Sequence, residues 1–152
     1  MKAVQIGLLV IAALLVVAAL APRFFGGGKV APTPTVFDTS VSLDDALRRS
    51  DETGRPVFAL VTADWCPPCQ GLKRHALTDA RVQRLLERST EPVYITDQNG
   101  HDVERLGVTA FPTSFILRDG EVLASLRGSA PPDAYLEWLE SNLPAGQANA
   151  SP

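Results

Sequence analysis

Two cysteines separated by two prolines, in the run WCPPC at positions 65–69, carry the clearest chemistry in the sequence. The thiolate, rather than the thiol, is the nucleophile, and unpaired backbone N–H groups at the start of a helix favour that anion. The spacing places Cys69 within bonding range of Cys66, so a mixed disulfide formed at Cys66 is open to attack by Cys69. Since proline has no N–H, we expect the amides of Cys69 and Gln70 to donate to an exposed Cys66 thiolate.

Other uses of such a cysteine pair stay open at this point. A structural disulfide between Cys66 and Cys69 closes a very short loop and stabilises the fold by about 2 kcal/mol, less than a long-range bridge. A zinc site needs more ligands, and the only histidines, His75 and His101, match no finger or ribbon spacing. Haem attachment requires histidine directly after the second cysteine, where this chain has Gln70. Redox chemistry accounts best for the pair, and no metal or other cofactor is expected.

The elements around the cysteines are a strand and a helix. Residues 57–62 (VFALVT) form a nearly continuous apolar run, typical of a central strand covered on both faces. A helix is predicted over about 67–76, and a second helical segment follows a cap at Thr78 or Asp79. Cys66 is therefore expected where the strand gives way to the helix.

The remaining elements complete one α/β domain. Ser42 and Asp45 resemble a capping box for a helix that ends near Gly54. The pair Asp119-Gly120 predicts a β-hairpin. The other predicted elements are strands at 93–96, 113–117 and 122–126, a helix at 102–106, and a last helix from Pro132 that buries Tyr135, Leu136, Leu139 and Leu143.

The N-terminal segment is apolar and long enough to span a membrane. Residues 4–21 contain no charge, and at about 1.5 Å per helical residue they reach roughly 27 Å. We expect an uncleaved transmembrane helix, because Pro22 would follow the cleavage site and the apolar run exceeds a usual signal core. Cleavage after the small-x-small run at 19–21 is the alternative. The N-terminal position of the segment favours a domain on the periplasmic or extracytoplasmic side.

Composition divides the chain into four parts. The membrane anchor or signal segment occupies 1–22, and a glycine- and proline-rich stretch at 23–40 is predicted to be a flexible linker. The folded domain extends over 41–143. Residues 144–152 are predicted to form a disordered tail.

The charge balance argues against nucleic acid as a partner. The formal net charge is −3, and after residue 30 there are 11 Lys and Arg against 17 Asp and Glu, without a basic cluster that could follow phosphates. The cations near the cysteines are expected on the solvated face of their helical region. These cations are Lys73, Arg74, Arg81, Arg84 and Arg88.

Two motifs of the sequence resemble those of the thioredoxin superfamily. The run ADWCPPC at 63–69 resembles the thioredoxin active-site motif, and GVTAFPT at 107–113 resembles the cis-proline loop of that family. The stretch 63–82 is most similar to the C-terminal thioredoxin domain of DsbD-type thiol:disulfide interchange proteins. The resemblance covers about Val41 to Leu143. It implies a thioredoxin-like α/β fold with a central mixed β-sheet flanked by helices, here preceded by the single transmembrane helix.

The resemblance also implies roles for individual residues. Cys66 is expected to attack substrate disulfides, and Cys69 to resolve the mixed disulfide. Trp65 is expected to shield the site and contact partners. Pro112 is the expected cis-proline beside the disulfide, and the backbone of Phe111 is expected to pair with an extended substrate segment. The residues expected to support the site and bind substrate are Trp65, Pro67, Pro68, Phe111 and Pro112.

The sequence departs from the family pattern at two positions. Thioredoxin-like reductases often carry a buried Asp, six residues before the first cysteine, that helps to deprotonate the resolving cysteine; here that position is Leu60. The proton route to Cys69 is therefore open, and Asp64 is expected to be a solvated carboxylate, with a water-mediated role as the alternative. Phe111 is bulkier than the residue often found before the proline. It is expected either to narrow the partner groove or to pack beside the loop.

These features together predict a membrane-tethered thiol–disulfide oxidoreductase that faces an oxidising compartment and reduces exported proteins. Because the sequence has no recognisable nucleotide, metal or flavin site, the electrons are expected from a protein partner, such as a membrane electron carrier. Alternatives are an oxidase or isomerase with the same residues, a non-catalytic interaction module at the membrane, and a protein that binds Cu(I) through both thiolates.

Overall fold

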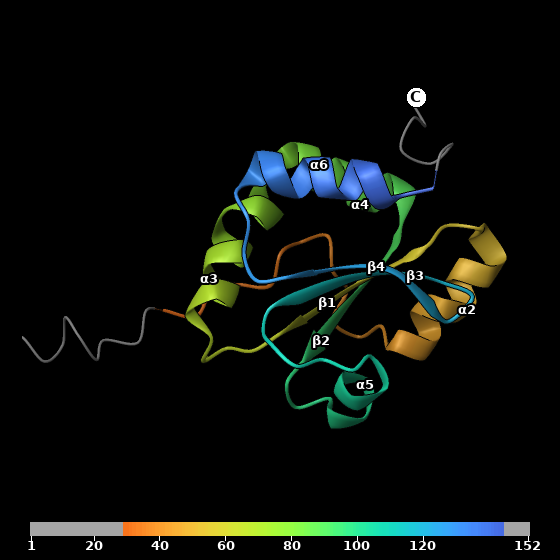
Figure 1. Ribbon diagram of the computed structural model, residues 1–152, viewed down its shortest axis with the longest axis horizontal. Coiled ribbons are helices and arrows are strands. Elements are labelled where there is room, and N and C mark those ends of the chain that lie inside the picture. Colours follow the sequence, from red (N-terminus) through yellow and green to blue (C-terminus); the bar gives the residue numbers. More distant parts are fainter. Residues whose placement is uncertain (1–28, 145–152) are drawn as a thin grey trace, which may run out of the picture.

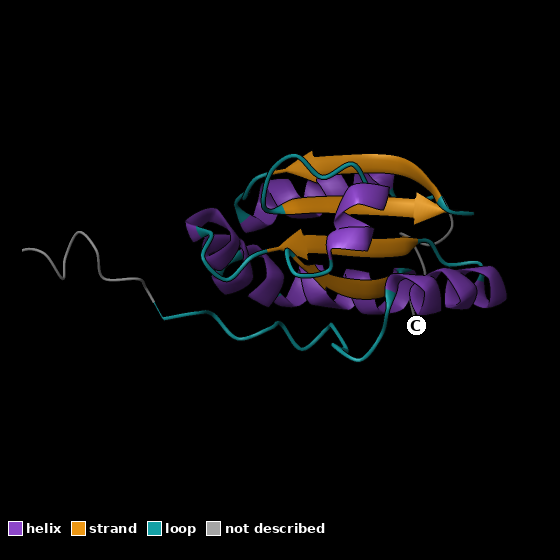
Figure 2. Ribbon diagram, turned by 90° about the horizontal axis from the view of Figure 1, so that it is seen from below, coloured by secondary structure: helices purple, strands orange, loops and turns teal. Residues whose placement is uncertain are grey.

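The computed structural model describes residues 29–144, which form a sheet between two layers of helices (Figures 1 and 2). The elements in chain order are α2 (Leu43–Thr53), β1 (Val57–Thr62), α3 (Pro67–Arg74), the 3₁₀ turn η1 (Ala76–Thr78), α4 (Ala80–Ser89), β2 (Glu91–Thr96), α5 (Gly100–Arg105), β3 (Thr113–Arg118), β4 (Glu121–Arg127) and α6 (Pro132–Asn142). Helices α3, α4 and α6 cover one face of the sheet, and α2 and α5 lie on the other (Figure 1). The predicted α/β domain is confirmed.

The sheet is mixed, with strand order β2-β1-β3-β4. β1 pairs in parallel with β2 and antiparallel with β3, and β3 pairs antiparallel with β4. Every residue of β1 is buried, as the continuous apolar run predicted. β1 is therefore central, and its carboxyl end delivers the chain to the cysteines.

Alternate residues of β1 enter two separate cores. Phe58 and Leu60 pack with Leu72 of α3 in the core under α3, α4 and α6. Val57 and Ala59 belong to the core on the α2 and α5 side. The period of two along a strand produces this division. β1 therefore provides the buried surface on which α3, the helix that carries the cysteines, packs.

Local signals set the helix ends close to the predicted positions. The capping box of Ser42 and Asp45 is present at the start of α2, and Gly54 ends that helix with φ 71°. Asp79 caps α4 by accepting a hydrogen bond from the amide of Arg81. The post-cysteine helix is shorter than predicted, because η1 follows it at Ala76.

Residues 29–41 pack against the domain, which differs from the flexible linker predicted up to residue 40. Val36 and Phe37 are buried, and the ring of Phe37 lies 6.0 Å from that of Phe58 and 5.5 Å from that of Tyr94. The amide of Ala31 donates to the side chain of Gln70 on α3 at 2.6 Å. Apolar side chains that follow the prolines of this segment therefore pack on the domain, which composition alone did not indicate.

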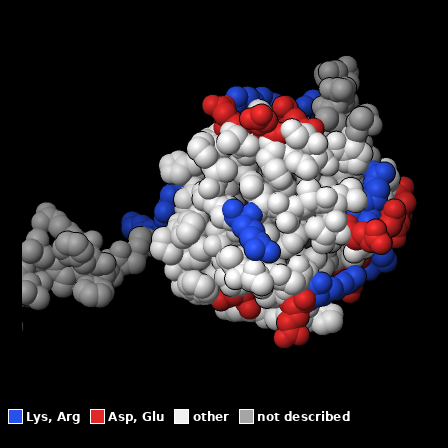
Figure 3. All heavy atoms as spheres, viewed as in Figure 1, with Lys and Arg blue, Asp and Glu red and all other residues white. Residues whose placement is uncertain are grey.

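The predicted membrane segment at 4–21 and the tail from residue 145 lie outside the described residues. Within 29–144, no helix combines the length and the apolar character needed to cross a bilayer. On the face drawn in Figure 3, most acidic and basic side chains lie near the edges, a basic side chain also lies nearer the middle, and the basic groups form no continuous strip.

Candidate active site

Cys66 and Cys69 form a disulfide at the junction of β1 and α3. Cys66 is the N-cap residue of α3, and Pro67 and Pro68 occupy the first helical positions, where a missing N–H leaves no hydrogen bond unmade. The two sulfurs are bonded at 2.19 Å, and the Cα atoms lie 5.3 Å apart. The expected pairing of the two cysteines at the start of a helix is therefore present.

One of the two predicted amide donors reaches the sulfur of Cys66. The N–H of Cys69 donates to Cys66 Sγ at 3.2 Å. The N–H of Gln70 instead donates to the carbonyl oxygen of Cys66 at 3.1 Å, as an ordinary helical hydrogen bond. That part of the prediction is wrong, because the helix already begins at Pro67 and uses the Gln70 amide internally.

Cys66 is more covered than expected. It keeps 3% of its surface exposed, and Cys69 is fully buried. Phe111 packs against the cluster of Ala63, Cys66 and Cys69, and its carbonyl oxygen lies 3.5 Å from Cys66 Sγ. Phe111 thus contributes both its ring and its backbone to the immediate surroundings of the disulfide. An incoming disulfide would have to reach Cys66 past this side chain.

Trp65 stands over the site as a large exposed side chain. It is 69% exposed and meets the ring of Phe111 edge-on, with centroids 5.8 Å apart. Its indole N–H donates to Oδ2 of Asp97 at 2.8 Å. Sequence reasoning missed Asp97, and the only available signal was its place directly after the strand that neighbours β1. An exposed apolar ring held by a hydrogen bond suits contact with another protein.

The cis-proline loop lies opposite the cysteines. The Phe111–Pro112 peptide bond is cis, as the resemblance implied, and Pro112 is buried. The carbonyl oxygen of Pro112 accepts a hydrogen bond from the amide of Gly128 at 2.7 Å. The hydroxyl of Thr113 donates to the carbonyl of Ala110 at 2.7 Å. The end of β4 and the loop itself therefore both hold Phe111 in place.

Two charged residues near α3, Lys73 and Asp64, are not simply solvated as predicted. Leu60 is fully buried, so β1 presents an apolar side chain at that position. Lys73, predicted on the solvated face, is buried, and its Nζ donates to Oδ1 of Asp64 at 3.2 Å. The prediction for Lys73 is wrong because the tertiary fold places its side chain beneath α3. Asp64 is exposed but not solely solvated, since it holds this ammonium.

Gln70 links three segments through its buried amide. Its Nε2 donates to the carbonyl oxygens of Ala63 and Asp64, at 3.4 and 3.0 Å, and its Oε1 accepts from Ala31. The turn before Cys66 is therefore held from the side of α3. The segment that enters the domain at residue 29 is attached to the same helix.

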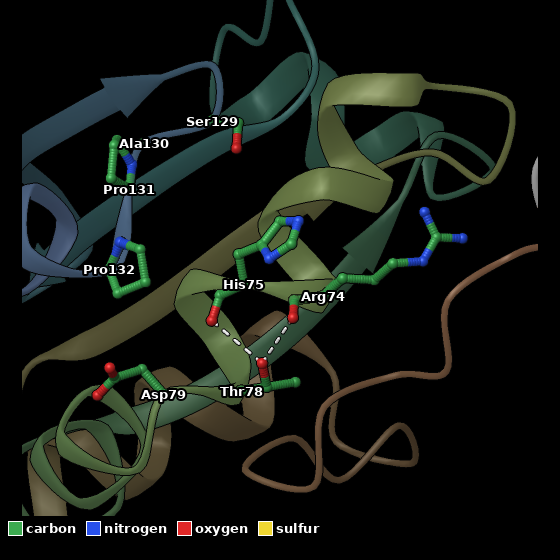
Figure 4. Close-up of a pocket in the computed structure, with 8 residues that line it drawn as sticks. All are labelled: Arg74, His75, Thr78, Asp79, Ser129, Ala130, Pro131 and Pro132. Carbon is green, nitrogen blue, oxygen red and sulfur yellow. Dashed lines mark hydrogen bonds between the residues drawn. The ribbon is translucent and has the colours of Figure 1, made fainter.

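An open pocket lies beside the site rather than at the sulfurs. It has a volume of about 640 Å³ between the end of α3 and the loop before α6, and the predicted site residues are not among those that line it (Figure 4). The side chain of Arg74 turns away from this pocket in Figure 4, and its guanidinium donates to the carbonyl of Lys29. His75 is exposed, as predicted. The pocket does not hold the thiol chemistry, because neither cysteine lines it.

Within residues 29–144, no cluster of three or more His, Cys, Asp or Glu side chains is arranged to hold a metal ion. The chemistry that the site offers is that of its own sulfurs: a cysteine pair at a helix start, with a cis-proline loop opposite. On this α/β fold, that arrangement defines the thioredoxin-fold thiol–disulfide oxidoreductases.

Comparison with known families and proteins agrees with this class. The thioredoxin-like domain family matches residues 43–142, and the chain belongs to that family. It is 30% identical to thiol:disulfide interchange protein DsbD of Escherichia coli (strain K12) over 128 residues, which cover 80% of this chain and 22% of that protein. It is 28% identical to thioredoxin of Rhodospirillum rubrum over 81 residues, 53% of this chain and 76% of that protein.

Solved structures show the same fold. The thioredoxin from Thermus thermophilus superposes with a TM-score of 0.60 at 26% identity, over 69% of this chain and 84% of that one. The reduced C-terminal domain of DsbD from Neisseria meningitidis gives a TM-score of 0.58 at 24% identity, over 70% of this chain and 98% of that one. The protein is a thiol–disulfide oxidoreductase of the thioredoxin fold.

Proposed function

We propose that this protein reduces disulfides of exported proteins from a membrane tether, by exchange through Cys66 and Cys69. The Cys66 thiolate attacks a substrate disulfide, which breaks and leaves a mixed disulfide on Cys66 and one substrate thiol. Cys69 then loses its proton to solvent and attacks Cys66 Sγ. This second step forms the Cys66–Cys69 bond, releases the second substrate thiolate and completes a two-electron reduction of the substrate.

The observation that carries this proposal is the position of Cys66 between α3 and the cis-proline loop. The Cys69 amide donates to Cys66 Sγ and favours a thiolate there. Phe111 brings its backbone carbonyl to 3.5 Å from the same sulfur. An extended substrate segment that pairs with the Phe111 backbone would thereby place its disulfide beside Cys66. Trp65, Pro67 and Pro68 are the exposed side chains around this approach.

The apolar segment at residues 4–21 supports action near a membrane. Residues 4–21 have the composition of a membrane-spanning helix. The described chain begins beside the active-site helix, because Lys29 and Ala31 contact Arg74 and Gln70 of α3 (Figure 1). With only a short stretch between residues 21 and 29, the disulfide would stay near the bilayer, on the periplasmic or extracytoplasmic side. A membrane or other protein electron donor would then be within reach of Cys66.

A trapping experiment tests the proposal. In a Cys69→Ser variant of the full chain, produced in its native cell, the mixed disulfide on Cys66 cannot be resolved. We expect exported cysteine-containing proteins, and a membrane protein that supplies electrons, to accumulate in covalent complexes that a reducing agent dissolves. The matched control is the Cys66→Ser/Cys69→Ser double variant, which should trap nothing. Absence of any mixed disulfide from an abundant protein whose Cys66 alkylates readily would refute the exchange mechanism.

The direction of electron flow needs a separate measurement. Equilibration of the Cys66–Cys69 pair with glutathione buffers gives its reduction potential. A reductase of this class should equilibrate below about −200 mV, whereas an oxidase lies nearer to −120 mV. A potential at the oxidising end would replace reduction with oxidation as the function of the same site.

Cell fractionation tests the tether. The full chain should remain with the membrane after a high-salt wash and require detergent for release. A product that is soluble in the exported space and begins near Pro22 would show that the segment is a cleaved signal peptide.

A further inference from the structure

α3 carries a buried lysine one turn beyond the resolving cysteine. The side chain of Lys73 is 1% exposed, and its Nζ donates to Oδ1 of Asp64 at 3.2 Å and to the hydroxyl of Tyr94 at 3.3 Å. A buried ammonium is destabilising unless close partners compensate for its lost hydration. Here both contacts are long, and Asp64 is 69% exposed. Structural stability alone is therefore a weak reason for a cation at this position.

Cys69 lies on the same side of α3 as Lys73. Residues four apart on a helix are neighbours, with Cβ atoms about 5–6 Å apart, and both side chains are buried. Apolar burial disfavours a thiolate, and Cys69 clusters with Ala63, Cys66 and the ring of Phe111. The reaction nevertheless requires Cys69 to ionise before it attacks Cys66.

Titratable groups face this region from several elements. Asp64 and Cys66 lie in the turn after β1, Tyr94 on β2, and Asp97 after β2. Tyr135 of α6 stays neutral, because burial raises the pKa of its phenol. Among these groups, both carboxylates reach toward water, which screens their charge more than that of a buried ammonium. Among these groups, Lys73 therefore carries the charge that solvent screens least.

We propose that Lys73 is a positioning residue for the resolving step, in which its buried ammonium favours the Cys69 thiolate. This proposal rests on the proposed exchange function of Cys66 and Cys69. The thiol proton leaves to solvent, and the Cys69 thiolate attacks Cys66 Sγ. The new Cys66–Cys69 bond replaces the bond from Cys66 to the substrate sulfur, which departs as a thiolate. A cation thus performs here, by electrostatic attraction, the task that a buried carboxylate at position 60 would perform as a base.

A two-phase reaction with an aromatic disulfide separates the two cysteines. The reduced full-length protein is mixed with 5,5′-dithiobis(2-nitrobenzoate); attack by Cys66 releases one coloured thiolate, and attack by Cys69 releases the second. In Lys73→Met, the second phase should be about tenfold slower at pH 7, and its pH midpoint should rise by about one unit. The first phase should change by less than about threefold, because Cys66 lies farther along the helix from Lys73.

Two control variants separate charge from packing. Lys73→Arg keeps the charge and should restore most of the second-phase rate. Arg84→Met removes an exposed cation from α4 and should leave both phases unchanged. A folded Lys73→Met protein with an unaltered or lowered pH midpoint overturns the proposal, since a purely structural role would not move this midpoint.

Asp64→Asn supplies a second test if Lys73→Met fails to fold. Asp64 is exposed, so its replacement leaves the core intact but removes the anion that opposes Lys73. The second phase should then become faster and its pH midpoint should fall. A slower second phase would identify Asp64 as the proton acceptor and overturn the role of Lys73, as would an unchanged midpoint. A wild-type protein that shows no first phase would instead refute the exchange function itself.

Discussion

The two ends of the β1–β2 pair each hold an ion pair, and the pairs are built differently. At the amino ends of the strands, Glu91 is 7% exposed and its Oε1 accepts from Arg55 Nε at 2.9 Å and from the hydroxyl of Thr53 at 3.0 Å. At the carboxyl ends, beside the disulfide, the buried member is the cation Lys73, and its anion Asp64 lies largely in water.

The difference suggests that the Arg55–Glu91 pair stabilises the fold, whereas the charge of Lys73 can influence the reactivity of the nearby cysteines. The Arg55–Glu91 pair binds the loop before β1 to the start of β2 with several charge-assisted hydrogen bonds. The Lys73–Asp64 pair has one contact at 3.2 Å and leaves its positive charge less compensated. Substitutions at the amino ends should therefore change stability, and substitutions at the carboxyl ends should change redox chemistry.

The largest effect is expected at Cys66. Cys66→Ser should lower the rate of disulfide exchange by at least about a thousandfold, because no other described sulfur can act as the first nucleophile. Loss of the disulfide should lower the free energy of unfolding by about 2 kcal/mol relative to the oxidised protein. Insulin reduction and urea unfolding measure the two effects. Full cellular function of Cys66→Ser would favour the non-catalytic interaction module.

The next effect concerns stability at the opposite end. Glu91→Gln should lower the free energy of unfolding by about 2 kcal/mol, because it leaves the half-buried Arg55 without its anion. The rate of disulfide exchange should stay the same. Urea unfolding of Glu91→Gln and of Glu104→Gln, an exposed control on α5, provides the comparison. A loss of exchange activity in folded Glu91→Gln would contradict the separation of the two ends.

A substitution of Trp65 tests whether the residues beside the disulfide contact protein partners. Trp65→Ala should lower kcat/KM for a protein disulfide by about tenfold, because an exposed aromatic ring gives large contact area to a partner. Reaction with a small aromatic disulfide should change much less, and stability should change by under about 0.5 kcal/mol. Asp97→Asn, which weakens the hold on the indole N–H, should show the same pattern at smaller size. Equal losses for large and small disulfides would assign Trp65 to the chemistry instead of to partner contact.

The smallest effect is the acid sensitivity that the helix caps contribute to stability. Hydrogen bonds from Arg81 lower the pKa of Asp79 to about 2, and hydrogen bonds from Ser42 lower that of Asp45 to about 2. Since both values lie below the unfolded value of about 3.9, this stabilisation is present above pH 4 and disappears as the pH falls to 2. Urea midpoints between pH 5 and 2 should fall less steeply in Asp79→Asn than in the unaltered protein. Parallel slopes would exclude this cap as a source.

Short-range signals carried much of the fold and the centre of the site. Some signals act over only a few residues, so the element that each produces can be predicted from the sequence. They are the apolar run of β1, the caps of α2 and α4, and the Asp119-Gly120 hairpin. Cys66 and Cys69 are equally local, because one helix start and a spacing of three residues bring them together. The hydrogen bond from Trp65 to Asp97 spans 32 residues, and the only sequence signal for it was the place of Asp97 directly after a strand.

Local sequence patterns were enough to locate the reactive sulfurs along the chain, the strand and helix that present them, and the proline after Phe111 in the opposing loop. The burial of Lys73, the small exposed surface of Cys66, and the packing of residues 29–41 on α3 and the core follow from tertiary contacts that no local pattern indicates. Periodicity and spacing report what neighbouring residues do to one another. Burial and pairing between distant segments depend instead on which surfaces meet when the layers pack, and the same pattern of cations along a helix is compatible with either a solvated or a buried cation.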